Sequence, residues 1–419
     1  MRSEVTDERD WLLRRDFLEK RGYRLRFEVY RVLPGEVKAE DSQRGYDLSE
    51  YLKAKPAIRT PISASKPAFP TASPRRSMDA QRVSDGSEVL LQSVSTAEHP
   101  QEVEIARLLS SPPHSGHPRN HSIPILDILD DPLDPDRHIL VMVRCVGIDD
   151  SAFDTVGEVV DCLRQIFQSI EYMHEHFIAH RDCNSLNFVQ DPTRLYPDGF
   201  HPVVIHYGRK NRTIVGKITR TECWPRYFAI TCDLSRQYDP ANGRASRRHG
   251  SPSECNPFPT DIYFLGNMIK KDFLYVTPLH HPEWVSVSLR PSAHRPLLFL
   301  QPLIDEMTLP DPASRPTIGE AIQKLDDLCG RLSNWELRQP GVRMAWYDRL
   351  EQRFRQFGRM VRGVKPVPVY VPRTDRVSLS GEMRAFYTQR AEVVEDGDEE
   401  KKERQEFEIG GTVEYSAIV

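Results

Sequence analysis

The sequence predicts a mixed α+β protein with a β-rich N-terminal part and a mainly helical C-terminal part. Apolar residues alternate with polar ones around Asp85-Gly86, which is typical of a β-hairpin. Apolar residues recur at steps of three and four over Asp154–Phe177, which predicts a long amphipathic helix. Two shorter apolar stretches, Asp261–Met268 and Pro302–Met307, are typical of buried helices and complete the helical part.

The composition indicates a globular protein with a sizeable core. The 419 residues are 39% hydrophobic and 28% charged, and the net charge of −4 argues against a dedicated nucleic-acid binder. Seven scattered cysteines without a C-x-x-C pair predict neither a zinc site nor a disulfide framework. The first ten residues are too charged for a signal peptide, and no apolar run reaches the roughly 18 residues of a membrane span. We therefore expect an intracellular protein, cytoplasmic or nuclear, without a transmembrane segment.

Shifts in composition divide the chain into four segments. Prolines, small residues and lysines without periodicity predict a disordered linker, and a run of Glu, Asp and Lys near the end predicts a disordered tail. The expected segments are a charged N-terminal segment at 1–51 with a strand near Tyr23–Tyr30, a Pro-rich linker at 52–78, the folded domain at 79–330, and a basic helix with an acidic tail at 331–419.

Within the folded domain the elements follow from local patterns. After the hairpin, a short helix is expected over Pro100–Leu109 and two strands over Ile123–Leu129 and His138–Arg144. Asp154 or Thr155 can cap the long helix. The further expected elements are a strand at Tyr227–Cys232 and a closing helix at Ile318–Leu328.

Two other patterns each allow two interpretations. His114, His117 and His121 lack a Cys or carboxylate companion at ligand spacing, so solvated loop histidines are favoured over a metal site. Further on, an apolar stripe runs along a helix that also carries six arginines; the stripe consists of Trp346, Leu350, Phe354, Phe357 and Val361. Such a helix either packs on the folded domain or binds acidic membranes or partners.

The run His180–Asn187 reads H-R-D-C-N-S-L-N and carries the most specific chemical signal. An Asp in this pattern can accept the proton of a substrate hydroxyl, and the Asn five residues later can hold a metal ion on ATP phosphates. Asp182 and Asn187 occupy these two positions, with Arg181 between His180 and Asp182.

This run is the catalytic-loop signature of protein kinases, and its surroundings strengthen the resemblance. Asp261–Gly266 resembles the D-x-W-S-x-G stretch whose Asp braces the catalytic loop, and Asp311–Thr317 resembles the D-P-x-x-R-P-T segment. Two short stretches resemble sequence motifs of kinase-like proteins common in mushroom-forming fungi, namely Leu195–Pro202 and Asn256–Tyr263. The resemblance covers about 79–330 and implies a two-lobed fold, with an N-lobe at about 79–145 and a C-lobe at about 146–330. It also implies that Arg315 pairs with Glu254 of an A-P-E-like motif.

Three positions depart from the kinase pattern. Gln92 stands where the β3 lysine is expected. Because Gln is neutral, we expect it to pair neither with the α/β-phosphates nor with the helix-C glutamate, for which Glu104 is the first candidate and Glu102 the second. Thr231-Cys232-Asp233 stands in place of D-F-G, and Thr lacks the anionic oxygen that Mg²⁺ favours. Asp233 can serve instead only if the loop is remodelled or the register differs by two. No G-x-G-x-x-G precedes the hairpin, where Thr71–Met78 lies.

The resemblance and its departures together predict a pseudokinase that acts as a binding or scaffold module. The alternative is an active ATP-dependent protein Ser/Thr kinase with Asp182 as base and with Asn187 and Asp233 as Mg²⁺ ligands. ATP and Mg²⁺ are the expected cofactors of the active form, and a scaffold needs none. Either form implies a protein partner or protein substrate. The site candidates are Asp182, Arg181 and Asn187 for catalysis, Gln92, Glu104 and Asp233 for cofactor binding, and Asn187 and Asp233 for metal.

Overall fold

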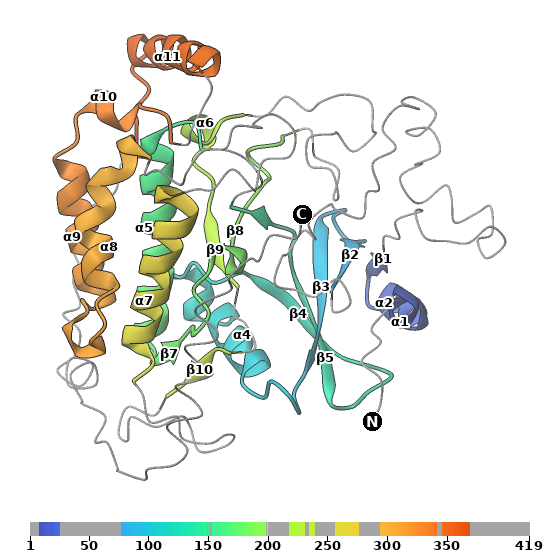
Figure 1. The fold of residues 1–419 in the computed structure, drawn as a ribbon. Helices are drawn as coiled ribbons and strands as arrows, with labels where there is room; N and C mark the ends of the chain where they lie inside the picture. Colours follow the sequence, from blue (N-terminus) through green and yellow to red (C-terminus); the bar gives the residue numbers. More distant parts are fainter. Residues whose placement is uncertain are drawn as a thin grey trace, which may run out of the picture.

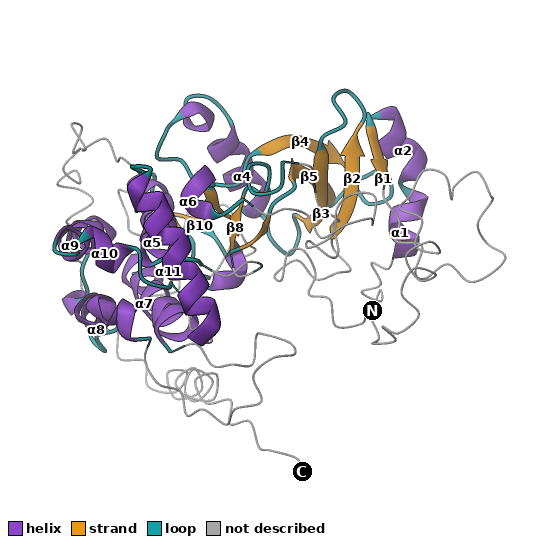
Figure 2. Ribbon diagram, turned by 90° about the horizontal axis from the view of Figure 1, so that it is seen from above, coloured by secondary structure: helices purple, strands orange, loops and turns teal. Residues whose placement is uncertain are grey.

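The computed structural model confirms a mixed α+β architecture (Figure 1). A small antiparallel sheet occupies one side of the molecule, and the helices α5, α7, α8 and α9 gather on the other side (Figure 2). Among the described residues, no helix is long and apolar enough to cross a membrane. The structure describes residues 8–25, 77–148, 150, 153–197, 199, 218–230, 234–238, 256–275, 294–341 and 346–368.

The sheet has five strands in the order β1-β2-β3-β5-β4, and every neighbouring pair is antiparallel. The strands are β1 (Tyr23–Leu25), β2 (Ser77–Arg82), β3 (Glu88–Ser95), β4 (Ile125–Asp130) and β5 (Arg137–Val143). The expected hairpin is the β2–β3 pair. Its turn uses Gly86 at a φ of +71°, and Asp85 Oδ1 accepts a hydrogen bond from the backbone N–H of Ser87 at 2.9 Å. Ser77 and Met78, assigned to the linker from composition, belong to β2.

The N-terminal segment is part of this sheet and not a separate unit. Strand β1 pairs with β2 in the register Tyr23↔Arg82 and Leu25↔Ala80. Before it, α1 (Glu8–Leu13) and α2 (Arg15–Lys20) pack beside the sheet, with Trp11 and Leu18 buried. The expected strand at Tyr23–Tyr30 is therefore confirmed over its first three residues, and the rest lies outside the described residues.

Between these two helices, Arg14 fixes the segment to the far end of the sheet. Its guanidinium donates to both carboxylate oxygens of Asp131, with Nε–Oδ1 at 2.9 Å and Nη2–Oδ2 at 2.6 Å. Both side chains are buried, so this is a bidentate ion pair in a poorly solvated place.

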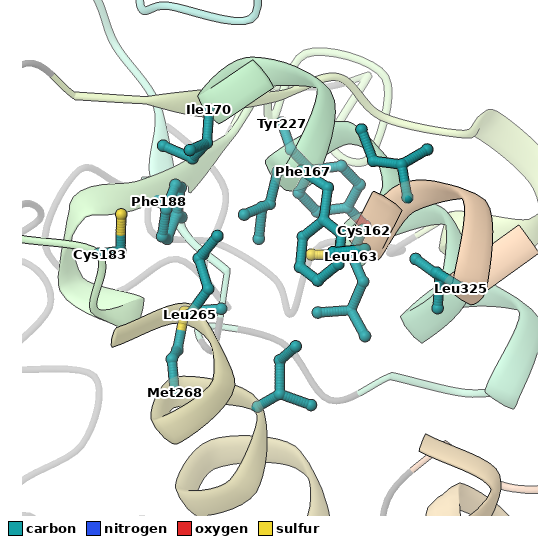
Figure 3. Packing of buried hydrophobic residues seen from close by; sticks show 14 of the residues in the cluster. Cys162, Leu163, Phe167, Ile170, Cys183, Phe188, Tyr227, Leu265, Met268 and Leu325 are labelled. Carbon is teal, nitrogen blue, oxygen red and sulfur yellow. The ribbon is translucent and has the colours of Figure 1, made fainter. Parts of the chain in front are cut away.

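The helical part is built around α5 (Val156–Glu175), which is buried on nearly all sides. Thr155 caps it, because Thr155 Oγ1 accepts a hydrogen bond from the backbone N–H of Glu158 at 3.1 Å. Figure 3 shows Leu163, Phe167 and Ile170 of α5 meeting side chains from the other helices and from the strands that follow α5. The remaining helices are α4 (Glu102–Ser110), α6 (Arg220–Cys223), α7 (Phe258–Met268), α8 (Gln301–Met307), α9 (Ile318–Gly330), α10 (Asn334–Leu337) and α11 (Trp346–Val361).

The chain beyond residue 330 packs on the folded domain, so the expected boundary at 330 does not end the unit. The Gln339 carbonyl accepts the backbone N–H of Val156 at 2.8 Å, at the first turn of α5. The packing is so close that a Cβ at Gly157 would lie 1.9 Å from the Pro366 carbonyl oxygen. The acidic tail expected after this segment lies outside the described residues.

This close approach predicts that Gly157→Ala destabilises the protein. Alanine is favoured over glycine in a helix by about 1 kcal/mol, but here the added methyl group forces the backbone of Pro366 away, at a net cost of about 1–3 kcal/mol. Gly358→Ala in α11 is the control, because a Cβ there meets nothing within 4 Å. Urea unfolding would measure both changes. Equal stabilisation by both substitutions would contradict the packing of Pro366 on α5.

Candidate functional site

The H-R-D-x-x-x-x-N run lies between the short strands β7 (Ile178–Ala179) and β8 (Phe188–Gln190). Strand β7 pairs with β10 (Arg236–Gln237), while β8 lies between β6 (Val146–Gly147) and β9 (Tyr227–Ala229). Phe188 packs into the helical core beside Cys183, within reach of Ile170 on α5 (Figure 3). The loop is therefore held at both ends by strands and from below by the core.

His180 is fully buried, and both nitrogen atoms of its ring contact backbone atoms in or beside the loop. Its Nε2 lies 3.0 Å from the Ile230 carbonyl oxygen, and its Nδ1 lies 3.2 Å from the backbone nitrogen of Asp182. Burial lowers the pKa of His180, which favours the neutral ring. A neutral imidazole protonated on Nε2 donates to Ile230 and accepts from Asp182, so one tautomer satisfies both contacts.

Asp261 in the first turn of α7 braces the loop from the helical side, as the resemblance implies. Its Oδ1 accepts the backbone N–H of Arg181 at 2.6 Å, and its Oδ2 accepts that of His180 at 2.8 Å. The Nε2 of His174 lies 2.9 Å from the same Oδ2. Arg181 has a φ of +66°, a left-handed conformation that costs a non-glycine residue about 1–2 kcal/mol, and the Asp261 contact holds it there.

Two amides orient the carboxylate of Asp182. Asn184 Nδ2 donates to Oδ1 at 2.6 Å, and Asn187 Nδ2 donates to Oδ2 at 2.7 Å and to the Asp182 carbonyl at 2.8 Å. The three sequence candidates Arg181, Asp182 and Asn187 thus come together in one hydrogen-bonded loop. Asn184 was not predicted as a site residue, because the kinase pattern leaves its position unspecified. The local signal that could have indicated it is an Asn two residues after an Asp, where the amide can reach the carboxylate.

Asn187 is fully buried, and its Oδ1 has no hydrogen-bond partner. A buried carbonyl oxygen without a donor suits a cation, so this atom fits one ligand position of a Mg²⁺ ion. Among the described residues, however, no group of three or more His, Cys, Asp or Glu side chains could hold a metal. The second expected ligand, Asp233, and Thr231 lie outside the part of the chain that the structure describes.

Gln92 of β3 points to α4 and meets a glutamate there. Its Nε2 donates to Glu102 Oε1 at 3.1 Å, and Glu102 is buried at 3% exposure. The expectation that Gln92 does not pair with a helix-C glutamate is therefore wrong, because a neutral amide can still donate a hydrogen bond to a carboxylate. The first candidate for the glutamate, Glu104, is also wrong: its side chain is exposed. Residues two apart in a helix differ by about 200° in direction, so only one of the two glutamates can face the sheet. The second candidate, Glu102, takes the position.

The stretch Thr71–Met78, which stands where a glycine-rich loop is expected, is in part a strand. Ser77 and Met78 pair with Gln92 and Leu91 as the first residues of β2, so they do not form a loop. The connection between β1 and β2 comprises residues 26–76, which include the rest of the expected stretch and lie outside the described residues.

Arg315 of the D-P-x-x-R-P-T-like segment is held by carbonyl groups. It donates to the carbonyl oxygens of Leu309 at 2.7 Å, Pro259 at 3.0 Å and Pro310 at 3.1 Å. Its guanidinium also lies over the ring of Tyr263, 4.7 Å from the centroid. The implied partner, Glu254, lies outside the described residues, so the expected pairing stays a prediction.

The three loop histidines are not solvated as expected. His114 and His117 are half-buried, with His114 Nδ1 at 2.8 Å from the hydroxyl of Tyr172 and the His117 ring stacked on Tyr172. His121 is buried, and its Nδ1 lies 3.1 Å from the Tyr227 carbonyl oxygen. Local composition suggested an open loop, but His114 and His117 pack against the aromatic ring of Tyr172 on α5.

Burial lowers the pKa of His121 from 6.5 to about 4, and the nearby Arg226 charge acts in the same direction. As the pH falls from 6.5 toward 4, His121 takes up a proton in the unfolded chain but stays neutral in the folded chain. Stability should therefore drop, by about 2–3 kcal/mol between pH 7 and pH 4.5 from this group. His121→Asn keeps a donor for Tyr227 but does not titrate, so its urea midpoint should fall less over the same range. Parallel pH curves for the two proteins would contradict this.

No protein-family model matches the chain, and no curated protein matches it.

Proposed function

We propose that this protein has a protein-kinase-like, two-lobed fold and works as a pseudokinase, binding a protein partner in the cytoplasm or nucleus with little or no phosphotransfer. The contact between Gln92 and Glu102 carries the proposal. In a protein kinase, a lysine on the third strand pairs with a helix-C glutamate and with the ATP phosphates. Here a neutral amide makes the same link between the sheet and the helix.

The order of elements supports the proposed fold. A five-stranded antiparallel sheet carries α4 beside it, and the long helix α5 leads into the H-R-D loop. The loop is followed by short strands and then by α7, whose Asp261 holds the loop backbone. This is the order expected from the resemblance, with the N-lobe at about 79–145 extended by β1.

The chemistry of Gln92 explains why the fold can persist without the activity. Glu102 keeps a hydrogen-bond donor, so α4 stays attached to β3. A neutral side chain, however, offers the ATP phosphates no positive charge. In a poorly solvated site, this should weaken the binding free energy that aligns the phosphates by several kcal/mol. The loop around Asp182 is also stabilised by its own hydrogen bonds, so its retention needs no catalytic explanation.

One observation favours the second candidate, an active ATP-dependent Ser/Thr kinase. The buried Asn187 Oδ1 lacks a partner, and a Mg²⁺ ion shared with Asp233 would supply one. In that case Asp182 would accept the proton of the substrate hydroxyl, with its carboxylate already oriented by Asn184 and Asn187. ATP would be the phosphoryl donor.

A thermal-shift titration with ATP, with and without Mg²⁺, separates the two. The pseudokinase predicts no Mg²⁺-dependent rise in Tm for the natural chain. Gln92→Lys combined with Thr231→Asp should create one, because ligand at 100 times its Kd adds about 2.7 kcal/mol of stability. Gln81→Lys, which adds a charge to the neighbouring strand β2, is the control and should not respond.

The active kinase predicts the opposite pattern. The natural chain would then show a Mg²⁺-dependent rise in Tm, and Asp233→Ala would abolish it. That result would overturn the pseudokinase proposal. No gain from the double substitution would contradict the assignment of Gln92 and Thr231 to the two missing kinase positions.

A further inference from the structure

Helix α11 (Trp346–Val361) docks on the domain through its polar face. Gln352, Gln356 and Arg359 are buried there. Arg359 Nη1 and Gln356 Nε2 donate to Asp154 Oδ2 at 2.9 and 2.8 Å, and Arg355 Nη2 donates to Oδ1 at 2.7 Å. Gln352 Nε2 donates to the carbonyl oxygens of Asp154 at 3.0 Å and of Arg338 at 2.9 Å. These directional contacts fix the rotation of α11 about its own axis.

The opposite face of α11 is apolar and exposed. Leu350, Phe354, Phe357 and Val361 are 50%, 70%, 55% and 70% exposed, and they follow one another at steps of four, three and four. These four residues are the described part of the expected apolar stripe, and the side chain of Trp346, its first expected member, lies outside the described part of the chain. Because the buried glutamines and Arg359 lie about half a turn away, the stripe cannot rotate inward without breaking the contacts to Asp154.

Cationic side chains flank the apolar stripe. Arg353 and Arg362 are exposed, and at about 100° per residue they lie on opposite edges of the stripe. Lys365, just beyond the helix, is exposed as well, while Glu351 is the exposed anion in this part of α11. Among the described side chains of residues 350–368, the exposed charges beside the stripe are therefore net positive.

We propose that the apolar stripe of α11, with its flanking cations, docks on the surface of an anionic lipid bilayer. A helix lying in the plane of a membrane inserts its apolar face at the headgroup boundary, and cations along its edges meet the lipid phosphates. The 16 residues of α11 give a rod of about 24 Å for such a contact. Figure 1 places α11 at the outer edge of the helical part, where a flat surface can reach it.

Charge argues against a second copy of the chain as the occupant. A symmetric pairing of two apolar stripes would bring the same arginines, Arg353 and Arg362, from both copies to one interface. No compensating excess of exposed anions lies on α11 to meet them among its described side chains. An anionic bilayer supplies the complementary charge directly, at about a fivefold gain in binding for each cation near its surface.

Co-sedimentation of the full chain with vesicles tests the proposal. We expect binding to vesicles of phosphatidylcholine with 30% phosphatidylserine, and much weaker binding to phosphatidylcholine alone. Arg353→Gln with Arg362→Gln should weaken binding about 30-fold. Phe354→Ser with Phe357→Ser should weaken it about 100-fold, since two large apolar side chains no longer insert.

The matched control is Val83→Ser with Leu133→Ser. These two residues are 52% and 53% exposed, comparable with Phe357, but they lie in turns of the sheet far from α11. The control should bind like the natural chain. Thermal melting checks that each variant is folded, which the exposure of all six side chains predicts.

Two results would overturn the proposal. One is the absence of binding to the anionic vesicles, or binding that either of the two α11 double substitutions leaves unchanged. The other is a dimer in sedimentation velocity that Phe354→Ser with Phe357→Ser converts to a monomer, which would assign the stripe to a second copy. A fully folded phenylalanine variant that still binds the vesicles as the natural chain does belongs to the first of these results.

Discussion

Asp261→Ala is expected to lower the free energy of unfolding by about 3–5 kcal/mol. The carboxylate is fully buried and accepts the backbone N–H groups of His180 and Arg181. Without it, both donors are left unsatisfied, and each costs about 1–3 kcal/mol. Arg181 also loses the contact that holds its left-handed backbone. Urea unfolding followed by circular dichroism would measure the loss.

Two further variants make this prediction specific. Asp261→Asn keeps one oxygen acceptor and should cost less than Asp261→Ala, because only one of the two backbone donors loses its partner. Asp326→Ala removes a carboxylate that pairs with Arg164 at the surface, where it is 51% exposed, and should cost at most about 1 kcal/mol. A loss at Asp261 no larger than that at Asp326 would mean that the loop does not depend on the buried carboxylate.

Asp154→Ala is expected to cost a similar amount, about 3–5 kcal/mol, at a different place. Its carboxylate joins α5 to α11 through Arg355, Gln356 and Arg359. Arg359 is 1% exposed, so removing Asp154 leaves a buried guanidinium without this anion. Glu222, at 3.3 Å from Arg359 Nη2, compensates for part of the charge.

A double-mutant cycle would confirm the coupling. Arg359→Ala should cost clearly less in the Asp154→Ala background than in the natural chain, with an interaction energy of about 1–3 kcal/mol. Asp130→Ala is the control, since its side chain is 95% exposed. Additive costs at Asp154 and Arg359 would contradict the direct contact and, with it, the fixed rotation of α11.

Local patterns in the sequence predicted most elements but not their long-range partners. The hairpin around Gly86 and the helices α5, α7 and α9 were predicted. Turn residues, capping residues and a hydrophobic period near 3.6 residues can each be recognised from residues that are close together in the sequence. The pairing of β1 with β2 was not predicted, because the two strands are separated by residues 26–76. Strand pairing across such a separation leaves no periodic signal in either segment.

The candidate site shows the same division. The H-R-D-x-x-x-x-N spacing brought Arg181, Asp182 and Asn187 together correctly, since five residues suffice to turn the loop back. The choice between Glu102 and Glu104 failed, because it depends on the rotation of α4 relative to β3. That rotation is set by the burial of Val103, Ile105 and Ala106 on the helix, and not by the glutamates.

For α11, the sequence offered docking on the domain and binding to an acidic surface as alternatives. The docking is confirmed, but through the polar face, which leaves the alternative open for the apolar one. One face of α11 can pack on the domain while the opposite face binds another surface, so the two interpretations do not exclude each other. The charge pattern in the sequence did not indicate which face packs on the domain.

The link between Asp154 and Arg359 also has a consequence for protein synthesis. The two residues are 205 positions apart in the chain. At about 5–20 residues per second, a ribosome needs roughly 10–40 s to add Arg359 after Asp154. During that interval α5 has no C-terminal segment to close over its first turn, and chains released early should be the ones that chaperones and proteases capture.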